Sequence, residues 1–255
     1  MIELINLKKQ FDDTWVANGV NLQIPTGQMT VIVGRSGVGK SVLLKQMVGL
    51  IKPTSGQILI DGIDITKLKG AELAQALEQF GYVFQFAALL DSLNIFENIG
   101  ITLLEKRIPT EQVLTIVKEK LALVNLSEDI LYKYPSELSG GMRKRVGLAR
   151  TMITNPKIIL YDEPTSGLDP ITTKIIHELM FNMQRALHLT SVVISHDLEI
   201  FKYADHVALL DEGKIQYFGP SATIWQAENP YIHQFIHGLP SGPIKTETTI
   251  KKIKT

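Results

Sequence analysis

The sequence predicts an α/β fold with antiparallel strands at one edge and an inserted block of helices. The segments 1–7 and 20–24 alternate apolar and polar side chains, as half-buried antiparallel strands do. An apolar strand at 29–33 leads through a glycine-rich loop into a helix. From Phe86 to about Pro156 strand signals are few and helical patterns dominate, and strands return after Pro156.

Each element follows from a local pattern and its punctuation. Pro109–Thr110 and Ser127–Glu128 mark helix starts, and Asp61–Gly62 and Asp211–Gly213 mark turns. We expect strands at 1–7, 20–24, 29–33, 57–62, 82–85, 157–162, 191–195, 206–210 and 214–218. We expect helices at 41–50, 69–79, 94–104, 110–124, 140–155, 172–188, 198–204 and 219–236, followed by a solvated tail.

Composition bounds the function. The 255 residues fit one large domain or one domain with an insertion. Lys plus Arg and Asp plus Glu number 26 each, which gives no basic field and argues against nucleic acid as a partner. Cysteine is absent, which excludes disulfides, thiolate metal sites and cysteine nucleophiles. Because no apolar run approaches the roughly 20 residues of a bilayer span, and no signal-peptide core is visible, we expect a cytoplasmic chain.

The stretch GRSGVGKS, from Gly34 to Ser41, carries the clearest chemistry. Its glycines let backbone N–H groups approach phosphate oxygens, and the helix that follows adds partial positive charge. Lys40 would reach the β- and γ-phosphates, and the Ser41 hydroxyl would bind Mg²⁺. The alternative is an ordinary turn before a helix. The residues expected to hold nucleotide phosphate are Gly34, Ser36, Gly37, Gly39, Lys40 and Ser41.

Two carboxylates end the apolar strand IILYDE. Asp162 could hold Mg²⁺, directly or through water, while Glu163 could polarise water as a general base. The alternative interpretation is a strand that ends in two solvated carboxylates. The upstream phosphate loop makes that interpretation less favoured.

Three further features narrow the interpretation. The Ser and two Gly of LSGGMRKR open a helix and form a second nest of backbone donors at Ser139, Gly140 and Gly141. Gln85 ends a strand and could reach Mg²⁺ or the water, and His196 ends another and could contact a γ-phosphate. Each of these features alone is also compatible with a plain structural role.

In this order and spacing, the motifs resemble the ATP-binding-cassette (ABC) ATPase family over about residues 1–225. The matching segments are GRSGVGKS, Gln85, LSGGM, IILYDE, SGLD and His196. The resemblance implies a RecA-like core with an antiparallel β subdomain and an α-helical subdomain at about 87–156. It also implies ATP and Mg²⁺ as cofactors and a head-to-tail dimer, in which each phosphate loop faces Ser139–Gly141 of the second copy.

The resemblance assigns further roles. Phe11 falls where the family places an aromatic ring on adenine, with Trp15 as the rival, and Asp169 of SGLD belongs to the nucleotide-binding set. Glu163, His196 and Gln85 form the catalytic set, and Ser41, Gln85 and Asp162 the metal set. Met142 departs from the glutamine of many members, which weakens one signature contact while Ser139–Gly141 stay intact.

Three segments bear on cargo. A resemblance to the Mla-type (MCE-associated) phospholipid transporter ATPases is found at Phe84–Ile99, directly around and after Gln85, at Pro135–Met142, and at Asn229–Ile244. That resemblance implies an integral membrane permease, MCE-domain and STAS-domain subunits, and a location at the cytoplasmic face of the inner membrane. The extension 226–255 is either a bare solvated tail or a contact with the neighbouring cassette or an accessory subunit. Other importers share every catalytic motif, a soluble ABC scaffold is a second alternative, and a kinase or GTPase leaves LSGGM, SGLD and His196 unexplained.

Overall fold

The computed structural model describes residues 1–245, and it is organised around a six-stranded sheet in the order β10-β9-β3-β8-β7-β6. Strands β9, β3, β8, β7 and β6 are parallel neighbours, and β10 pairs antiparallel with β9 at one edge. Because parallel strands end at the same edge, the loops after β3, β6, β7 and β8 meet there. The strands are β3 (Met29–Val33), β6 (Phe80–Val83), β7 (Ile158–Asp162), β8 (Thr190–Ile194), β9 (His206–Asp211) and β10 (Lys214–Pro220).

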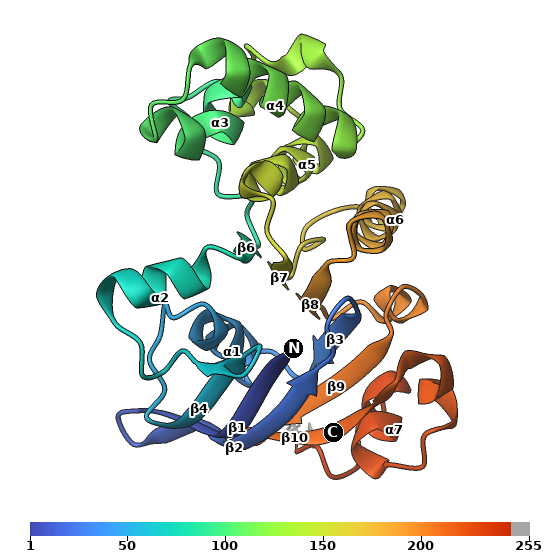
Figure 1. Ribbon diagram of the computed structural model, residues 1–255. Coiled ribbons are helices and arrows are strands. Elements are labelled where there is room, and N and C mark those ends of the chain that lie inside the picture. Colours follow the sequence, from blue (N-terminus) through green and yellow to red (C-terminus); the bar gives the residue numbers. More distant parts are fainter. Residues whose placement is uncertain (246–255) are drawn as a thin grey trace.

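A second, antiparallel sheet of four strands in the order β2-β1-β4-β5 lies beside it (Figure 1). Its strands are β1 (Ile2–Phe11), β2 (Thr14–Ile24), β4 (Ser55–Ile60) and β5 (Ile63–Asp64). The first two strands are longer than the sequence predicts, because residues 8–19 continue the hairpin up to a turn at Asp12, where φ is +48°. Backbone hydrogen bonds between β1 and β2, rather than an alternating pattern of apolar side chains, define that part of the hairpin.

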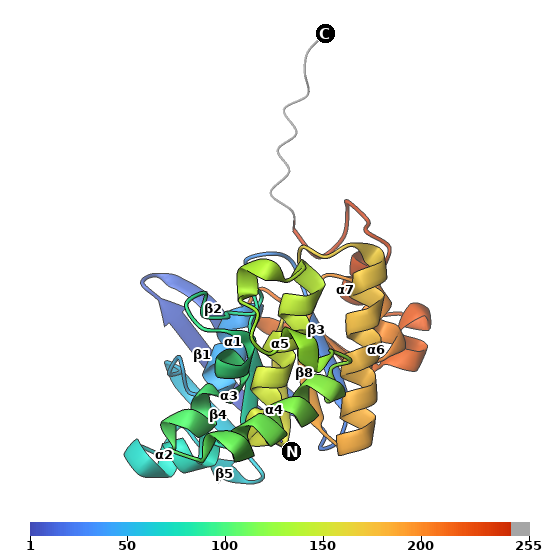
Figure 2. The same cartoon turned by 90° about the horizontal axis from the view of Figure 1, so that it is seen from above.

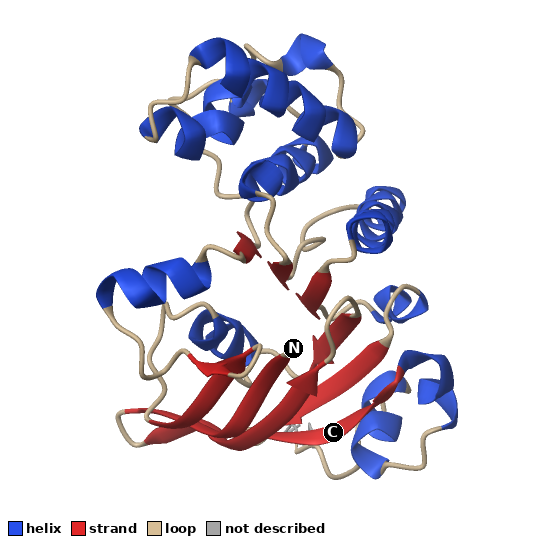
Figure 3. Ribbon diagram, in the orientation of Figure 1, coloured by secondary structure: helices blue, strands red, loops and turns tan. Residues whose placement is uncertain are grey.

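Helices α3 (Ile95–Glu105), α4 (Thr110–Leu123) and α5 (Gly140–Thr151) form a separate group, here called the helical lobe. Figure 3 shows that this part of the molecule contains helices and loops. Seen from above, α6 runs along one side of the lobe (Figure 2), and the start of α5 packs on α6 through Gly141 and Thr172. The remaining helices are α1 (Lys40–Met47), α2 (Gly70–Leu77), α6 (Pro170–Leu187) and α7 (Pro230–Ile236).

The central sheet is covered on both faces, which explains its continuous apolar strands. All five residues of β3 are buried. Met29, Val31 and Val33 belong to a core shared with α6 and the helical lobe, whereas Ile32 faces a core shared with α1 and the antiparallel sheet. Because side chains alternate between the two faces of a strand, β3 contributes side chains to both cores.

Most predicted elements are present, and besides the longer β1 and β2 the differences include two changes of boundary. The strand predicted at 82–85 ends at Val83, and the backbone then turns through left-handed conformations at Ala87 and Ala88. The last predicted helix is divided into a short turn at Ser221–Gln226 and α7, because Asn229 caps a new helix that begins with Pro230. The part of the predicted tail at 246–255 lies outside the described residues. Within residues 1–245, no helix combines the length and apolar character that crossing a bilayer requires.

Candidate active site

The phosphate loop, Gly34–Ser41, joins β3 to α1 at the carboxyl edge of the central sheet. Its backbone needs glycine at two points. A Cβ at Gly34 would lie 2.3 Å from the Leu210 carbonyl oxygen, and a Cβ at Gly39 would lie 2.3 Å from Val16 Cγ1. Gly39, the N-cap of α1, is also left-handed with φ at +106°. The loop is therefore wedged between β9 and the β1–β2 hairpin.

Lys40 is buried and folded back onto its own loop. Its Nζ donates to the carbonyl oxygens of Gly34 and Arg35, both at 2.8 Å, and lies 3.4 Å from His196 Nε2. Burial lowers the pKa of Lys40 to about 8, although the charges of Glu163 and Asp162 act in the opposite direction. The loop thus holds a cation that an incoming anion would stabilise.

Ser41 and Asp162 are in contact at the N-terminus of α1. Asp162 Oδ1 accepts a hydrogen bond from Ser41 Oγ at 2.7 Å, and Asp162 Oδ2 accepts one from the Tyr82 hydroxyl at 2.9 Å. Burial and the charge of Asp162 raise the pKa of Tyr82, so its hydroxyl remains a donor. Hydroxyl and carboxylate oxygens are the ligands that Mg²⁺ prefers, and Mg²⁺ commonly takes only one or two protein ligands beside substrate phosphate. These residues therefore fit a magnesium ion that arrives with a nucleotide.

Glu163 and His196 form a pair at the ends of adjacent strands. His196 Nε2 lies 2.8 Å from Glu163 Oε1, and the Gln85 amide donates to Glu163 Oε2 at 3.3 Å and to Ser166 Oγ at 3.2 Å. Glu163 itself has a left-handed backbone, with φ at +48°. The structure thus brings Gln85 together with Glu163, and its roles as metal ligand and catalytic residue stay predictions.

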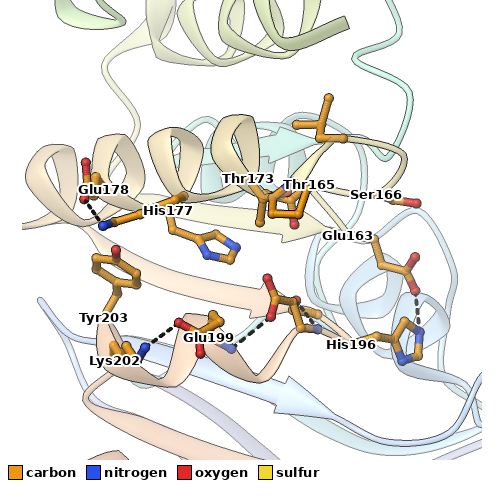
Figure 4. A pocket seen from close by; sticks show the side chains of 15 residues that line it. Glu163, Thr165, Ser166, Thr173, His177, Glu178, His196, Glu199, Lys202 and Tyr203 are labelled. Carbon is orange, nitrogen blue, oxygen red and sulfur yellow. Dashed lines mark hydrogen bonds and ion pairs between the residues drawn. The ribbon is translucent and has the colours of Figure 1, made fainter.

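A cavity of about 890 Å³ opens beside this pair, between α6 and the turn at Leu198–Lys202. Figure 4 shows Glu163 and His196 at one end and Lys202 and Tyr203 at the other. His177 points into it from α6, and burial lowers the pKa of His177. The residues lining this cavity do not include the phosphate loop, so the loop lies beside the cavity rather than inside it.

The second predicted anion nest lies in the helical lobe. Ser139 caps α5, where its Oγ accepts a hydrogen bond from the Met142 amide at 3.2 Å. A Cβ at Gly141 would lie 2.5 Å from Thr172 Cγ2, and one at Gly140 would lie 3.6 Å from Leu168 Cδ2. Residues 139–141 therefore lie against α6 and the loop before it, and their contact with nucleotide stays a prediction.

Asp169 has a local structural task. Its carboxylate caps α6, accepting from the Ile171 and Thr172 amides at 3.0 Å each and from Thr172 Oγ1 at 2.6 Å. These bonds hold the pKa of Asp169 below its usual value. A role toward nucleotide stays a prediction beside this observed cap.

The two adenine candidates lie on the β1–β2 hairpin. Phe11 is at the end of β1, and Lys9 Nζ lies 4.7 Å from the centre of its ring. Trp15 is on β2 next to Val16, the residue that contacts Gly39. Both rings are about two-fifths exposed, Phe11 at 42% and Trp15 at 43%, so the choice between them stays a prediction.

Sequence reasoning missed two residues that organise the site. Tyr82 holds Asp162 from the neighbouring strand β6. Lys144 is buried and donates to the Gln85 carbonyl oxygen, which links α5 to the segment that carries Gln85. Tyr82 begins the strand predicted at 82–85, which is a usable signal, whereas the RKR run in which Lys144 lies looks like an ordinary solvated face.

The fold and the site together define a P-loop ATPase of the ATP-binding-cassette type. A family model described as "ABC transporter" matches residues 17–166, and the chain therefore belongs to the ABC transporter family as an ATP-binding subunit with ATPase activity.

Three curated relatives illustrate the range of similar proteins. The chain is 40% identical over 245 residues to the "Probable ribonucleotide transport ATP-binding protein mkl" of Mycobacterium tuberculosis, covering 95% of this chain and 68% of that protein. It is 36% identical to the "Intermembrane phospholipid transport system ATP-binding protein MlaF" of Haemophilus influenzae, covering 96% and 93%. It is 38% identical to the "Methionine import ATP-binding protein MetN" of Haemophilus ducreyi, covering 98% and 74%.

Solved cassettes have the same fold. The ATP-binding cassette MJ0796, in a dimeric post-hydrolysis state with ADP and Pi, superimposes with a TM-score of 0.79 at 31% identity, covering 87% of this chain and 99% of that one. The cbiO1 protein of Clostridium perfringens, described as part of a cbiONQ transporter complex, gives a TM-score of 0.81 at 30% identity, covering 94% and 95%. The RecA-like core with its two subdomains, expected from the motifs, is confirmed.

Proposed function

We propose that this chain is the ATP-hydrolysing subunit of a membrane transporter that moves phospholipid between the inner and outer membranes. One observation carries the choice of cargo. The similarity to MlaF covers nearly the full length of both proteins, at 96% and 93%, whereas mkl and MetN are matched over 68% and 74% of their own lengths. All three matches extend through α7 of this chain, so the choice of phospholipid is supported by the coverage of MlaF together with the resemblance of Phe84–Ile99 and Asn229–Ile244 to Mla-type ATPases.

In this proposal the phosphate loop binds the triphosphate of ATP. Lys40 gives up its hydrogen bonds to the Gly34 and Arg35 carbonyl oxygens and forms hydrogen bonds with phosphate oxygens instead. Its buried ammonium group is then paired with a full negative charge. Backbone amides of Gly34–Gly39 and the start of α1 surround the β-phosphate. Ser41 and Asp162 would hold Mg²⁺, which shields phosphate charge when bound.

Glu163 acts as the general base toward the attacking water. Its carboxylate is held from two sides by His196 and Gln85, so it is oriented before any water arrives. His196 also lies near Lys40, which places it between the base and the phosphate loop. We assign it the γ-phosphate contact for that reason, and we assign Gln85 the task of reporting the state of Glu163 to the helical lobe through Lys144.

A second copy completes the site. In the proposed head-to-tail dimer, Ser139, Gly140 and Gly141 of one copy face the phosphate loop of the other, and the loop that contains Asp169 lies at the seam. The support is that these residues lie in the helical lobe, against α6, with polar backbone groups of a helix start at hand. The dimeric state of MJ0796 supports the pairing of two cassettes.

The permease is proposed to bind at the helical lobe near Gln85. Phe86, 84% exposed, and Leu90, 46% exposed, lie between β6 and α3, and Tyr132, 69% exposed, lies between α4 and α5, so all three offer apolar contact area to a partner. Because Gln85 precedes Phe86 directly, movement of Gln85 would reach this surface. Such coupling needs two arrangements whose balance ATP shifts.

The division of the chain and its location belong to the same proposal. Residues 1–225 would be the ABC ATPase domain, with the helical subdomain at about 87–156, and 226–255 the C-terminal extension. The subunit would lie at the cytoplasmic face of the inner membrane, bound to the permease, with MCE-domain and STAS-domain subunits as further partners.

Purification of the tagged chain from detergent extract tests the cargo. We expect co-purification with an integral membrane chain and, by lipid mass spectrometry of the complex, enrichment of phospholipid over the extract. In nanodiscs, phospholipid composition should change the ATPase rate while added methionine should not. Recovery only in soluble complexes would contradict the transporter assignment and favour a scaffold.

A methionine or other small-solute importer is the second candidate, favoured by 38% identity to MetN over 98% of this chain. The nanodisc assay separates the two, because ATPase activity that responds to methionine and is indifferent to lipid would support the importer.

A further inference from the structure

The C-terminal strap, residues Leu239–Lys245, is fastened to the body of the protein by one buried side chain. Gln234 on α7 is 4% exposed. Its Nε2 donates to the Ile244 carbonyl oxygen at 3.1 Å and to that of Leu239 at 3.2 Å, while its Oε1 accepts from the Ile244 amide at 2.7 Å. The amide of Gln234 thus pairs with Ile244 in both directions, as a neighbouring strand would.

The strap is also anchored by burial. The Ile244 side chain is 5% exposed and belongs to the core shared with α6 and the helical lobe. A two-way hydrogen-bonded pair and a buried apolar side chain at the same residue fix the position of the next residue, Lys245. The end of the strap is therefore held in place rather than simply lying on the surface.

Lys245 meets the phosphate loop. Its carbonyl oxygen accepts a hydrogen bond from Arg35 Nη1. Arg35 is the second residue of the phosphate loop, and its own carbonyl oxygen is one of the two that hold Lys40. One short path therefore runs from Gln234 through Ile244 and Lys245 to Arg35, and from Arg35 to the lysine of the loop.

Arg35 has an alternative partner close to the loop. Asp211, at the end of β9, is 2% exposed, and its Oδ2 has no hydrogen-bond partner. The charge of Arg35 lowers the pKa of Asp211, although burial and Glu212 raise it overall. Because a buried carboxyl oxygen without a donor is costly, Asp211 is an alternative partner for the Arg35 guanidinium when the contact with Lys245 is lost.

We infer that Gln234 and Arg35 are positioning residues for nucleotide binding, and that the strap sets the conformation of the phosphate loop. The inference rests on the proposed ATP site at this loop. Release of the strap would remove the tertiary anchor that the strap gives to the Arg35 side chain, and the backbone of the loop between Gly34 and Lys40 would be less restrained. The loop would then have to be ordered by the nucleotide itself, at a cost in affinity.

A double-mutant cycle in the full chain tests this. Arg35→Ala and Gln234→Leu should each weaken Mg²⁺–ADP binding about 3–10-fold by calorimetry, a fraction of what a charge-assisted hydrogen bond contributes. Because they break one path, the double variant should bind no more weakly than the weaker single variant. The KM for ATP should rise similarly, with kcat within about twofold, since neither change touches Glu163 or His196.

Two comparisons keep the result specific. Arg35→Lys retains a donor and a charge and should recover most of the affinity, while Arg107→Ala, in an exposed turn after α3, should leave it unchanged. If Gln234→Leu proves unfolded by its melting curve, the Arg35→Ala and Arg35→Lys pair still decides. Multiplying effects in the double variant, absence of rescue by Lys, or unchanged affinity in Arg35→Ala would overturn the inference.

Measuring Lys40→Ala alongside separates a failure of the strap inference from a failure of the proposed nucleotide site. If Lys40→Ala weakens ADP binding and Arg35→Ala does not, the strap inference alone is wrong. If neither variant weakens it, the proposed nucleotide site itself is wrong.

Discussion

Replacing Glu163 with glutamine removes the proposed base while keeping the size of the side chain. In the structure Glu163 accepts from Gln85 on one oxygen and pairs with His196 on the other. Glutamine keeps one acceptor and turns the other oxygen into an N–H₂ group, so the orientation is partly retained but proton abstraction is lost. General-base catalysis contributes about 10²–10⁴-fold, which corresponds to about 3–5 kcal/mol of barrier height.

Nucleotide binding should survive this change, because Lys40, Ser41 and the backbone of the phosphate loop are untouched. One indirect effect has to be controlled. The charge of Glu163 raises the pKa of Lys40, so its removal lowers that pKa further below about 8. At pH 7, below the Lys40 pKa of about 8, the lysine of the parent protein is largely charged, so the comparison belongs there.

The assay is steady-state phosphate release at saturating Mg²⁺–ATP and pH 7, with ATP affinity measured by calorimetry on the same preparation. Glu178→Gln is the matched control, because Glu178 lines the far part of the same cavity and lies 3.9 Å from Lys174. We expect turnover to fall about 10²–10⁴-fold in Glu163→Gln and to stay near the parent in Glu178→Gln. Parent-like turnover in Glu163→Gln would remove the base assignment.

Three further predictions concern the phosphate and metal half of the site. Lys40→Ala should weaken ATP binding about 10–100-fold in calorimetry, because charge-assisted hydrogen bonds contribute about 1.5–3 kcal/mol each; equal affinity would rule out the cradle. ATP affinity should be highest below pH 8 and fall as the pH rises through the Lys40 pKa of about 8. Above that pH, Lys40 of the free protein has lost its proton, whereas Lys40 in contact with phosphate keeps it, so binding must take up a proton. A flat profile from neutral to alkaline pH would contradict this. Tyr82→Phe frees one oxygen of Asp162 and should raise the Mg²⁺ concentration for half-maximal ATPase several-fold, and an identical Mg²⁺ titration would show that Tyr82 does not position Asp162.

The parts of the site that sequence reasoning predicted are those encoded locally. The phosphate loop is specified by its own glycines between an apolar strand and a helix, and IILYDE is specified by a buried strand that ends in two acids. The inserted helical lobe was visible because the period of the apolar residues changes near Phe86. In each case the signal lies within about a dozen neighbouring residues.

The parts that were not predicted depend on contacts between distant segments. Tyr82 and Asp162 are 80 residues apart, and their bond follows from the placing of β6 next to β7, which no local pattern reveals. Gln234 and Arg35 belong to segments that look unrelated until α7 and the strap are folded. The outer part of the β1–β2 hairpin was missed for a different reason, because backbone pairing rather than alternating apolar residues defines it.

The central claim is that one chain contains only half of each ATP site. Its most direct test is the mass of Glu163→Gln in solution with and without Mg²⁺–ATP, measured by light scattering on a gel-filtration column. We predict a monomer without nucleotide and a dimer with it, and we predict that Ser139→Arg in the same background abolishes the dimer while leaving ATP binding to the single chain. The account would be contradicted if the variant kept the mass of one chain with Mg²⁺–ATP and was also present as a single copy in the complex with its membrane partners.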